Sequence, residues 1–122
     1  MRYMSFTLTP DRVLDRTKTV TRRTGWTTLS PGQLIQPALK CMGLKRGEKV
    51  QRLGAPILTV SVRRERLRRM TDDVSYGLAE CALEGFGSHP TLCRPSEFIV
   101  FFCKTHRCAP DDFVTRIEFE YT

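Results

Sequence analysis

The stretch Arg16-Thr17-Lys18-Thr19-Val20-Thr21-Arg22-Arg23 concentrates hydroxyl groups and cations around a single aliphatic side chain, Val20. Its threonines and Val20 are β-branched and favour extended backbone. In a strand, side chains alternate between the two faces, so Lys18, Val20 and Arg22 would share one face and the threonines and Arg23 the other. Neither face is apolar. The stretch therefore predicts an extended segment whose side chains serve something other than a hydrophobic core.

Two interpretations of this segment follow from its residue types. Guanidinium and ammonium groups beside hydroxyls match the oxygens of an anion such as phosphate, and arginine adds a planar fork of donors. Alternatively, a strand rich in arginine lies at the edge of a sheet, faces water and discourages pairing with another chain. The residues alone leave both open.

The net charge of +7 is unevenly distributed along the chain. Residues 11–69 carry 15 Lys and Arg against four Asp and Glu, a net +11, whereas residues 70–122 carry four against nine, a net −5. Arginine outnumbers lysine by 15 to five, which suits bidentate phosphate contacts and stacking on bases. We expect RNA or a nucleotide as partner. A membrane surface is disfavoured, because no basic amphipathic helix with an exposed apolar face is evident.

A length of 122 residues predicts one domain, spanning residues 1–122, with a single core. No segment approaches the roughly 20 apolar residues of a membrane span, and the first residues lack the blocks of a signal peptide. We therefore expect a cytoplasmic protein.

The five cysteines form an odd set without CxxC spacing, which favours reduced thiols that pack as small core residues. An alternative is a zinc site made of Cys93, Cys103, His106 and Cys108, with His89 in reserve. Their spacing departs from that of zinc fingers and ribbons. We expect no metal and no other cofactor.

Hydrophobic periodicity, caps and turn residues predict strands and helices in an order that groups the helices together. Expected strands cover residues 3–8, 33–36 (stopped by Pro37), 56–66 and 113–121. Expected helices cover residues 10–16, 72–84 (capped by Thr71 and ended by Gly85) and 95–106, the last with a core stripe of Phe98, Phe101 and Phe102. This order predicts an α+β fold with a small, curved, mostly antiparallel sheet or barrel.

The strand at residues 56–66 has a distinct pattern at each end. Alternation would direct Leu58, Val60 and Val62 into the core and Ile57, Thr59, Ser61 and Arg63 to the other side. The strand then ends in a run of arginines. This run forms a cationic ledge around a single acid, Glu65; its members are Arg63, Arg64, Arg66, Arg68 and Arg69.

The opening stretch resembles the signature of the ASCH domain, a family with a PUA-like β-barrel. That signature is glycine, any residue, lysine, two residues, threonine, one residue and arginine. Lys18, Thr21 and Arg23 match it, while Arg16 stands where the family most often has glycine. The likeness extends over nearly the whole chain, with residues 37–54 as an additional loop. It implies a PUA-like barrel with about three flanking helices.

The resemblance also implies contact with RNA or modified nucleosides. Some ASCH proteins are amidohydrolases that deacetylate N4-acetylcytidine with a lysine, a threonine and a glutamate, and others are reported as ribonucleases. Matched to this chain, the first two are Lys18 and Thr21, and the glutamate is Glu84, with Glu80 the less favoured choice. Arginines beside Lys18 favour its neutral amine, whereas Glu84 favours its charged form.

RNA binding is the first hypothesis, hydrolysis of acylated cytidine the alternative, and ribonuclease action the least favoured. The expected nucleic-acid contacts are Lys18, Thr21, Arg22, Arg23, Trp26, Arg63, Arg64 and Arg66. For Trp26, an alternative is that its ring covers one end of the core.

Overall fold

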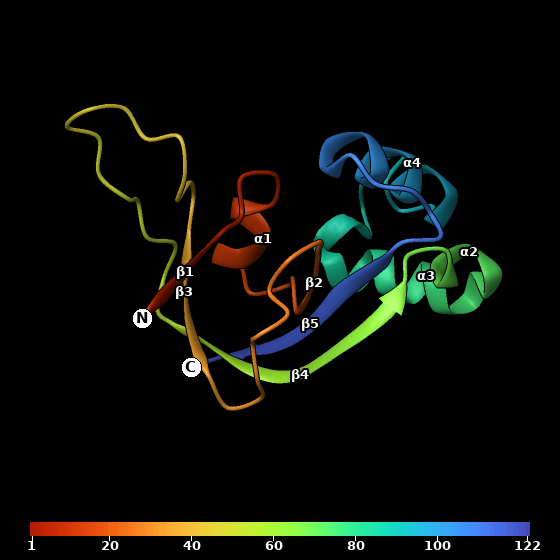
Figure 1. Ribbon diagram of the computed structural model, residues 1–122, viewed down its shortest axis with the longest axis horizontal. Helices are drawn as coiled ribbons and strands as arrows, with labels where there is room; N and C mark the ends of the chain where they lie inside the picture. The colour runs from red at the N-terminus through yellow and green to blue at the C-terminus, as the bar shows by residue number, and fades with distance from the viewer.

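The computed structural model describes residues 1–122 as an α+β fold, in which one curved sheet is flanked by helices (Figure 1). The predicted fold class is therefore confirmed. Its elements in chain order are β1 (Arg2–Ser5), α1 (Pro10–Leu14), β2 (Val20–Arg23), β3 (Leu34–Ala38), β4 (Ile57–Arg66), α2 (Arg69–Asp72), α3 (Val74–Cys81), the π-helical turn η1 (Ala82–Phe86), α4 (Pro95–His106) and β5 (Phe113–Tyr121).

The five strands lie in the order β1-β3-β4-β5-β2, with β1 parallel to β3 and all other pairs antiparallel. The sheet is mixed and curved but not closed, so the expectation of a closed barrel was wrong. The two edge strands, β1 and β2, share no backbone pairing. Instead, the Arg23 side chain on β2 donates to the Ser5 carbonyl on β1 at 2.6 Å. We call this gap between β1 and β2 the seam.

Strand β4 contains a bulge that reverses the expected facing of its first half. Ile57 and Thr59 are buried, whereas Val60 is 43% exposed. The register with β5 shifts between Thr59 and Ser61, so Val60 is the additional residue, and Val62 returns to the core face. The expected inward orientation was thus wrong for Leu58 and Val60 and right for Val62. Strict alternation cannot reveal an inserted residue.

Strand β3 runs through Pro37 rather than stopping there. Its pairing with β4 covers only Leu34 and Ile35, and beyond them β3 pairs with β1 and, through an isolated bridge at Ala38, with Arg52. Proline is tolerated there because the ladder with β4 has already ended. Residues 39–56 then leave the sheet as the long excursion seen in Figure 1.

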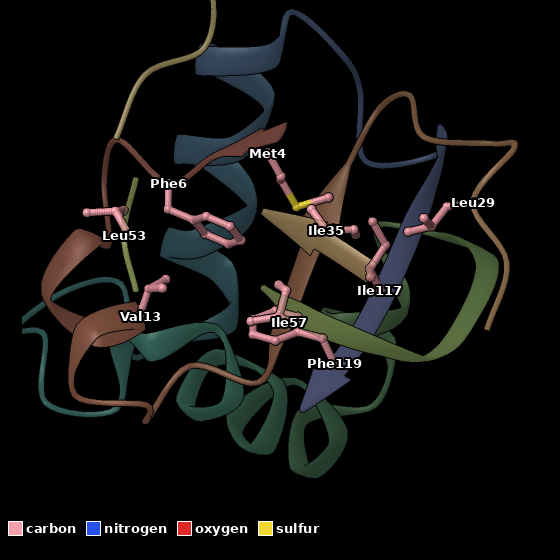
Figure 2. Close-up of a cluster of buried hydrophobic side chains, with 9 residues drawn as sticks. All are labelled: Met4, Phe6, Val13, Leu29, Ile35, Leu53, Ile57, Ile117 and Phe119. Atoms are coloured by element: carbon pink, nitrogen blue, oxygen red, sulfur yellow. The ribbon is translucent and has the colours of Figure 1, made fainter. Parts of the chain in front are cut away.

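The first hydrophobic core lies in the concavity of the sheet, where α1 covers it (Figure 2). Phe6 and Phe119 meet edge to face with ring centroids 6.0 Å apart. Trp26 packs against the margin of this core. The buried members are Met4, Phe6, Val13, Leu29, Ile35, Leu53, Ile57, Ile117 and Phe119.

The helix expected over residues 72–84 is divided among three elements: the chain turns at Asp73, between α2 and α3, and the π-helical turn η1 begins directly after Cys81. Asp73 caps α3 by accepting from the Tyr76 amide at 3.2 Å, so the expected cap at Thr71 was wrong. Gly85 adopts a φ of +97°, which glycine tolerates without strain, and ends the helical run as predicted. The closing helix begins at Pro95 and ends at His106, as predicted.

A second hydrophobic core joins α2, α3, η1 and α4 to the start of β5. Phe98 and Phe102 are buried there as predicted, whereas Phe101 is half-buried and is not part of this core, so its expected core position was wrong. Cys81 is fully buried in this core, where burial raises the pKa of its thiol to about 12. All five cysteines are free thiols. None of the helices combines the length and apolar character that crossing a bilayer requires.

Candidate functional site

A cavity of about 200 Å³ opens at the seam. Four segments far apart in the sequence form it: the chain after β1, the strand β2, the turn η1 and one side of α4. Its lining residues are Ser5, Thr7, Leu8, Thr9, Lys18, Thr21, Arg22, Arg23, Glu84, Phe86, Phe98, Phe101, Phe102 and His106. The cavity thus lies where the two edge strands of the sheet do not pair.

Lys18 is held at the cavity by hydrogen bonds of its own backbone amide and carbonyl. Its amide donates to the Arg12 carbonyl at 3.1 Å, and its carbonyl accepts from the Tyr121 hydroxyl at 2.5 Å. The next amide, of Thr19, donates to the Leu83 carbonyl at 2.9 Å. The position of Lys18 is therefore fixed by α1, β5 and η1 together.

The Lys18 ammonium contacts Glu84 twice. It donates to the Glu84 carbonyl at 2.6 Å and to its carboxylate at 3.1 Å. Both side chains are about 4% exposed. Burial lowers the pKa of Lys18 and outweighs the carboxylate, which raises it, while Arg22 and Arg23 lower it further. Two of the three ammonium donors are used, and one is left over.

Thr21 is buried at the cavity wall with its hydroxyl only partly used. Its Oγ accepts from Arg23 Nε at 3.2 Å, and it donates its own proton to no protein group. Arg23 in turn reaches across the seam, with its guanidinium 5.0 Å from the centre of the Phe6 ring. Thr21 consequently keeps a free donor, held in place by a cation.

Arg22 faces away from Thr21 and is completely buried. Its guanidinium binds three carboxylates, those of Glu80 at 2.5 Å, Glu65 at 3.2 Å and Glu84 at 3.2 Å. It also donates to the Tyr76 hydroxyl at 3.2 Å, and only its Nε lacks a partner. Arg22 thus has no exposed surface to offer a phosphate, although its sequence position suggested one.

Glu80, one of the glutamates that bind Arg22, also binds a second buried arginine, Arg116. We call the cluster of Arg22, Glu65, Glu80 and Arg116 the ion-pair network. Arg116 binds both oxygens of Glu80, at 2.5 and 3.1 Å. Although burial acts to raise it, the pKa of Glu80 is lowered to about 2 by hydrogen bonds and charge from Arg116 and Arg22. Glu84 links this network to Lys18 and is the glutamate in the cavity wall, whereas Glu80 is not.

Sequence reasoning did not place Glu65, Tyr76 or Arg116 near the site. Glu65 accepts from Arg63 at 2.7 Å and from the Tyr76 hydroxyl at 2.8 Å. One signal was present in the sequence: Glu65 is the only acid in its run of arginines. A second is visible only in the structure, where Arg116 lies between the buried residues Thr115 and Ile117. A charged side chain inside a core strand needs a buried counter-ion.

The remaining candidate contacts lie outside the cavity. Trp26 packs on the first core with the Arg2 guanidinium 4.0 Å from its ring centre, which is the covering role considered above. Arg63, Arg64 and Arg66 are exposed on β4. Arg64 donates to Thr115 Oγ at 2.9 Å, and Arg66 stacks on Phe113 at 4.6 Å.

No three or more His, Cys, Asp or Glu side chains are gathered as a set that would hold a metal ion. The cysteines and His106 considered as zinc ligands are therefore not assembled as a site. Burial raises the pKa of Cys108 to about 11, so its neutral thiol form is favoured. His106 instead stacks on Phe102, with ring centres 4.0 Å apart.

Comparison with known proteins finds a structural neighbour with a similar fold but no matching family. No family model matches the chain, and no curated protein is similar to it in sequence. Among solved structures, protein EF3133 from Enterococcus faecalis, described under the family model DUF984, superimposes with a TM-score of 0.55 at 20% identity. The match covers 91% of this chain and 67% of that protein. At this identity the likeness establishes the fold alone.

Proposed function

We propose that this protein is an ASCH-type, PUA-like domain that binds RNA or a nucleoside by enclosing one base in the seam cavity. The resemblance of Lys18, Thr21 and Arg23 to the ASCH signature supports the family. The fold likeness to EF3133 is compatible with it. Free cysteines support a cytoplasmic location, because thiols stay reduced there.

The observation that carries this proposal is the convergence of unused polar groups with aromatic walls in one cavity. Lys18 and Thr21 each keep a free donor, and the Glu84 carboxylate keeps acceptor capacity. Phe86, Phe98 and other aromatic side chains face the same space. Bases are recognised in this way, by hydrogen bonds to their edges and stacking on aromatic rings.

The size of the cavity limits what it holds. Its volume of about 200 Å³ is below the roughly 300 Å³ at which drug-sized pockets begin. It therefore suits a single base extruded from a strand, or the base of a free nucleoside. For a strand, the exposed cations Arg63, Arg64 and Arg66 would supply the phosphate contacts.

Titration calorimetry with cytidine, N4-acetylcytidine and a short single-stranded RNA tests the proposal. Thr21→Val, which removes the free donor, is expected to weaken nucleoside binding by about tenfold. Thr59→Val is the matched control, because the Thr59 hydroxyl is buried without a partner and lies outside the cavity. Equal losses in both variants, or no binding by the wild type, would contradict the proposal.

RNA affinity supplies a second measurement. Each phosphate contact releases counterions, so affinity for the strand should fall steeply between low and moderate salt, while affinity for the nucleoside should change little. Affinity for RNA that does not depend on salt would exclude the arginines as phosphate contacts.

Hydrolysis of N4-acylated cytidine is the second candidate function, and the buried Lys18 is the observation that favours it. A lysine with a lowered pKa can accept a proton, and Arg23 bound to Thr21 Oγ favours negative charge on that oxygen. Thr21 Oγ would attack the acyl carbon while Lys18 takes its proton. The bond from that carbon to N4 breaks, the amine leaves with the proton, and water then releases the acyl group from Thr21.

Release of cytidine from N4-acetylcytidine, followed by chromatography, tests this second function. Wild type should release it, and Thr21→Val and Lys18→Met should not, whereas Thr59→Val should match the wild type. Equal release by all four proteins would exclude the mechanism. Ribonuclease action is not favoured by any arrangement of the glutamates, because each buried one is bound by arginine or lysine.

A further inference from the structure

A second hollow, of about 310 Å³, adjoins the seam cavity. The two share Leu8, Thr9 and Phe86 in their walls, so they lie side by side. The hollow lies between α1 and the turn that follows η1, where Asp11 and Ser88 line it. Half of its ten lining residues have polar side chains, in contrast to the aromatic wall that α4 gives the cavity: Thr9, Asp11, Arg12, Ser88 and His89.

Hydrogen bonds within the protein determine which polar groups in the hollow keep a free donor or acceptor for a ligand. Ser88 Oγ accepts from Arg12 at 3.2 Å, so its proton is free to donate. His89 Nδ1 accepts from the amides of Leu92 at 3.0 Å and Thr91 at 3.2 Å, which places the ring proton on Nε2 as a donor. The Asp11 carboxylate receives no hydrogen bond and is exposed. The wall of the hollow thus carries one free carboxylate acceptor and two free donors.

We infer that this hollow is a ribose subsite, in which Asp11 accepts from the sugar hydroxyls and Ser88 and His89 donate to them. This inference rests on the proposed binding of a base in the adjoining cavity. A carboxylate is the usual partner of ribose hydroxyls, which are both donors and acceptors. A phosphate would face the Asp11 carboxylate, and the one nearby guanidinium, of Arg12, is already paired with Asp15 at 3.1 Å. The neutral sugar is therefore favoured over a phosphate.

The subsite predicts selectivity for ribonucleosides over deoxyribonucleosides. Dissociation constants of cytosine, cytidine, 2′-deoxycytidine and cytidine 5′-monophosphate should be measured by calorimetry with the wild type. We expect cytidine to bind about tenfold tighter than 2′-deoxycytidine or cytosine, and the monophosphate to bind no tighter than cytidine.

Two variants assign the selectivity to the hollow. Asp11→Asn and Ser88→Ala should each bring cytidine close to 2′-deoxycytidine while leaving cytosine binding unchanged. Asp72→Asn, an exposed aspartate on α2 outside both hollows, is the control. Because Asp11 and Ser88 are exposed, neither change should affect folding, which thermal unfolding would verify.

The outcomes separate this inference from the proposed function. Equal binding of cytosine, cytidine and 2′-deoxycytidine would overturn the ribose subsite and leave base binding intact. Markedly tighter binding of the monophosphate would overturn it in favour of an anion site. Selectivity that persists in both variants would place the sugar elsewhere. If none of the four ligands binds, the proposed function fails together with the subsite.

Discussion

Neighbouring residues of β2 belong to two regions that use buried charge in opposite ways. Arg22 enters the ion-pair network, where four acceptors occupy its guanidinium. Thr21 and Lys18 line the seam cavity, where each keeps one donor without a protein partner. All are buried to a similar degree. Burial of a polar group therefore does not distinguish the two regions, whereas a donor left unused inside a cavity does.

The largest expected effect comes from removing the centre of the network. In Arg22→Met, three buried glutamates lose their shared counter-ion, so the free energy of unfolding should fall by about 3–5 kcal/mol. Denaturant unfolding measures it. Arg64→Met, which removes an exposed arginine with one hydrogen bond, should cost less than about 1 kcal/mol. A similar, small loss in both would show that the network does not support the fold.

Gly85 connects the two regions, because it follows Glu84. In Gly85→Ala, the positive φ should cost about 1–2 kcal/mol of stability, and the new Cβ would lie 3.1 Å from the Arg12 side chain and 3.5 Å from Lys18. We expect weaker nucleoside binding as well. Gly47→Ala is a matched control, because Gly47 has a φ of +82° with open space around it. It should lose comparable stability and no affinity; a loss of affinity in both would exclude crowding at Lys18 as the cause.

Acid should weaken the ion-pair network, because protonation removes the charge of its glutamates. The pKa of Glu80 is about 2 in the folded protein, below the 4.5 of the free side chain. The network's contribution is therefore complete above about pH 4.5 and is lost as the pH falls towards 2. The free energy of unfolding, measured from pH 7 to 2, should differ more between the wild type and Glu80→Gln at neutral pH than at pH 2. A gap that stays constant with pH would contradict the depressed pKa.

The smallest effect on stability is expected at the cavity wall. Thr21→Val leaves Arg23 Nε without its hydroxyl acceptor and should cost about 1 kcal/mol or less. Thr59→Val, which removes an unpaired buried hydroxyl, should be neutral or stabilising. Thermal unfolding of both variants measures the difference. A loss at Thr21 as large as that at Arg22 would show that the cavity wall is part of the structural network.

Local signals in the sequence predicted much of the fold. Pro95 at a helix start, Gly85 at a helix end and the alternation over residues 113–121 each depend on a few adjacent residues. The bulge at Val60 was missed, because an inserted residue is defined by its partner strand. The break at Asp73 was missed as well, since a continuous helical pattern runs across it.

For the site, the residue types can be read from the chain alone: a basic segment with lysine, threonine and arginine, followed far along the chain by glutamates. Which cation remains open to a ligand depends on tertiary contacts. Arg22 and Arg23 are adjacent and chemically identical, yet Arg22 meets glutamates 43 to 62 residues away, while Arg23 spans the seam to Ser5. This is because pairing and burial are set by strand register and by which strands form the edges of the sheet, and these join segments that no local pattern relates.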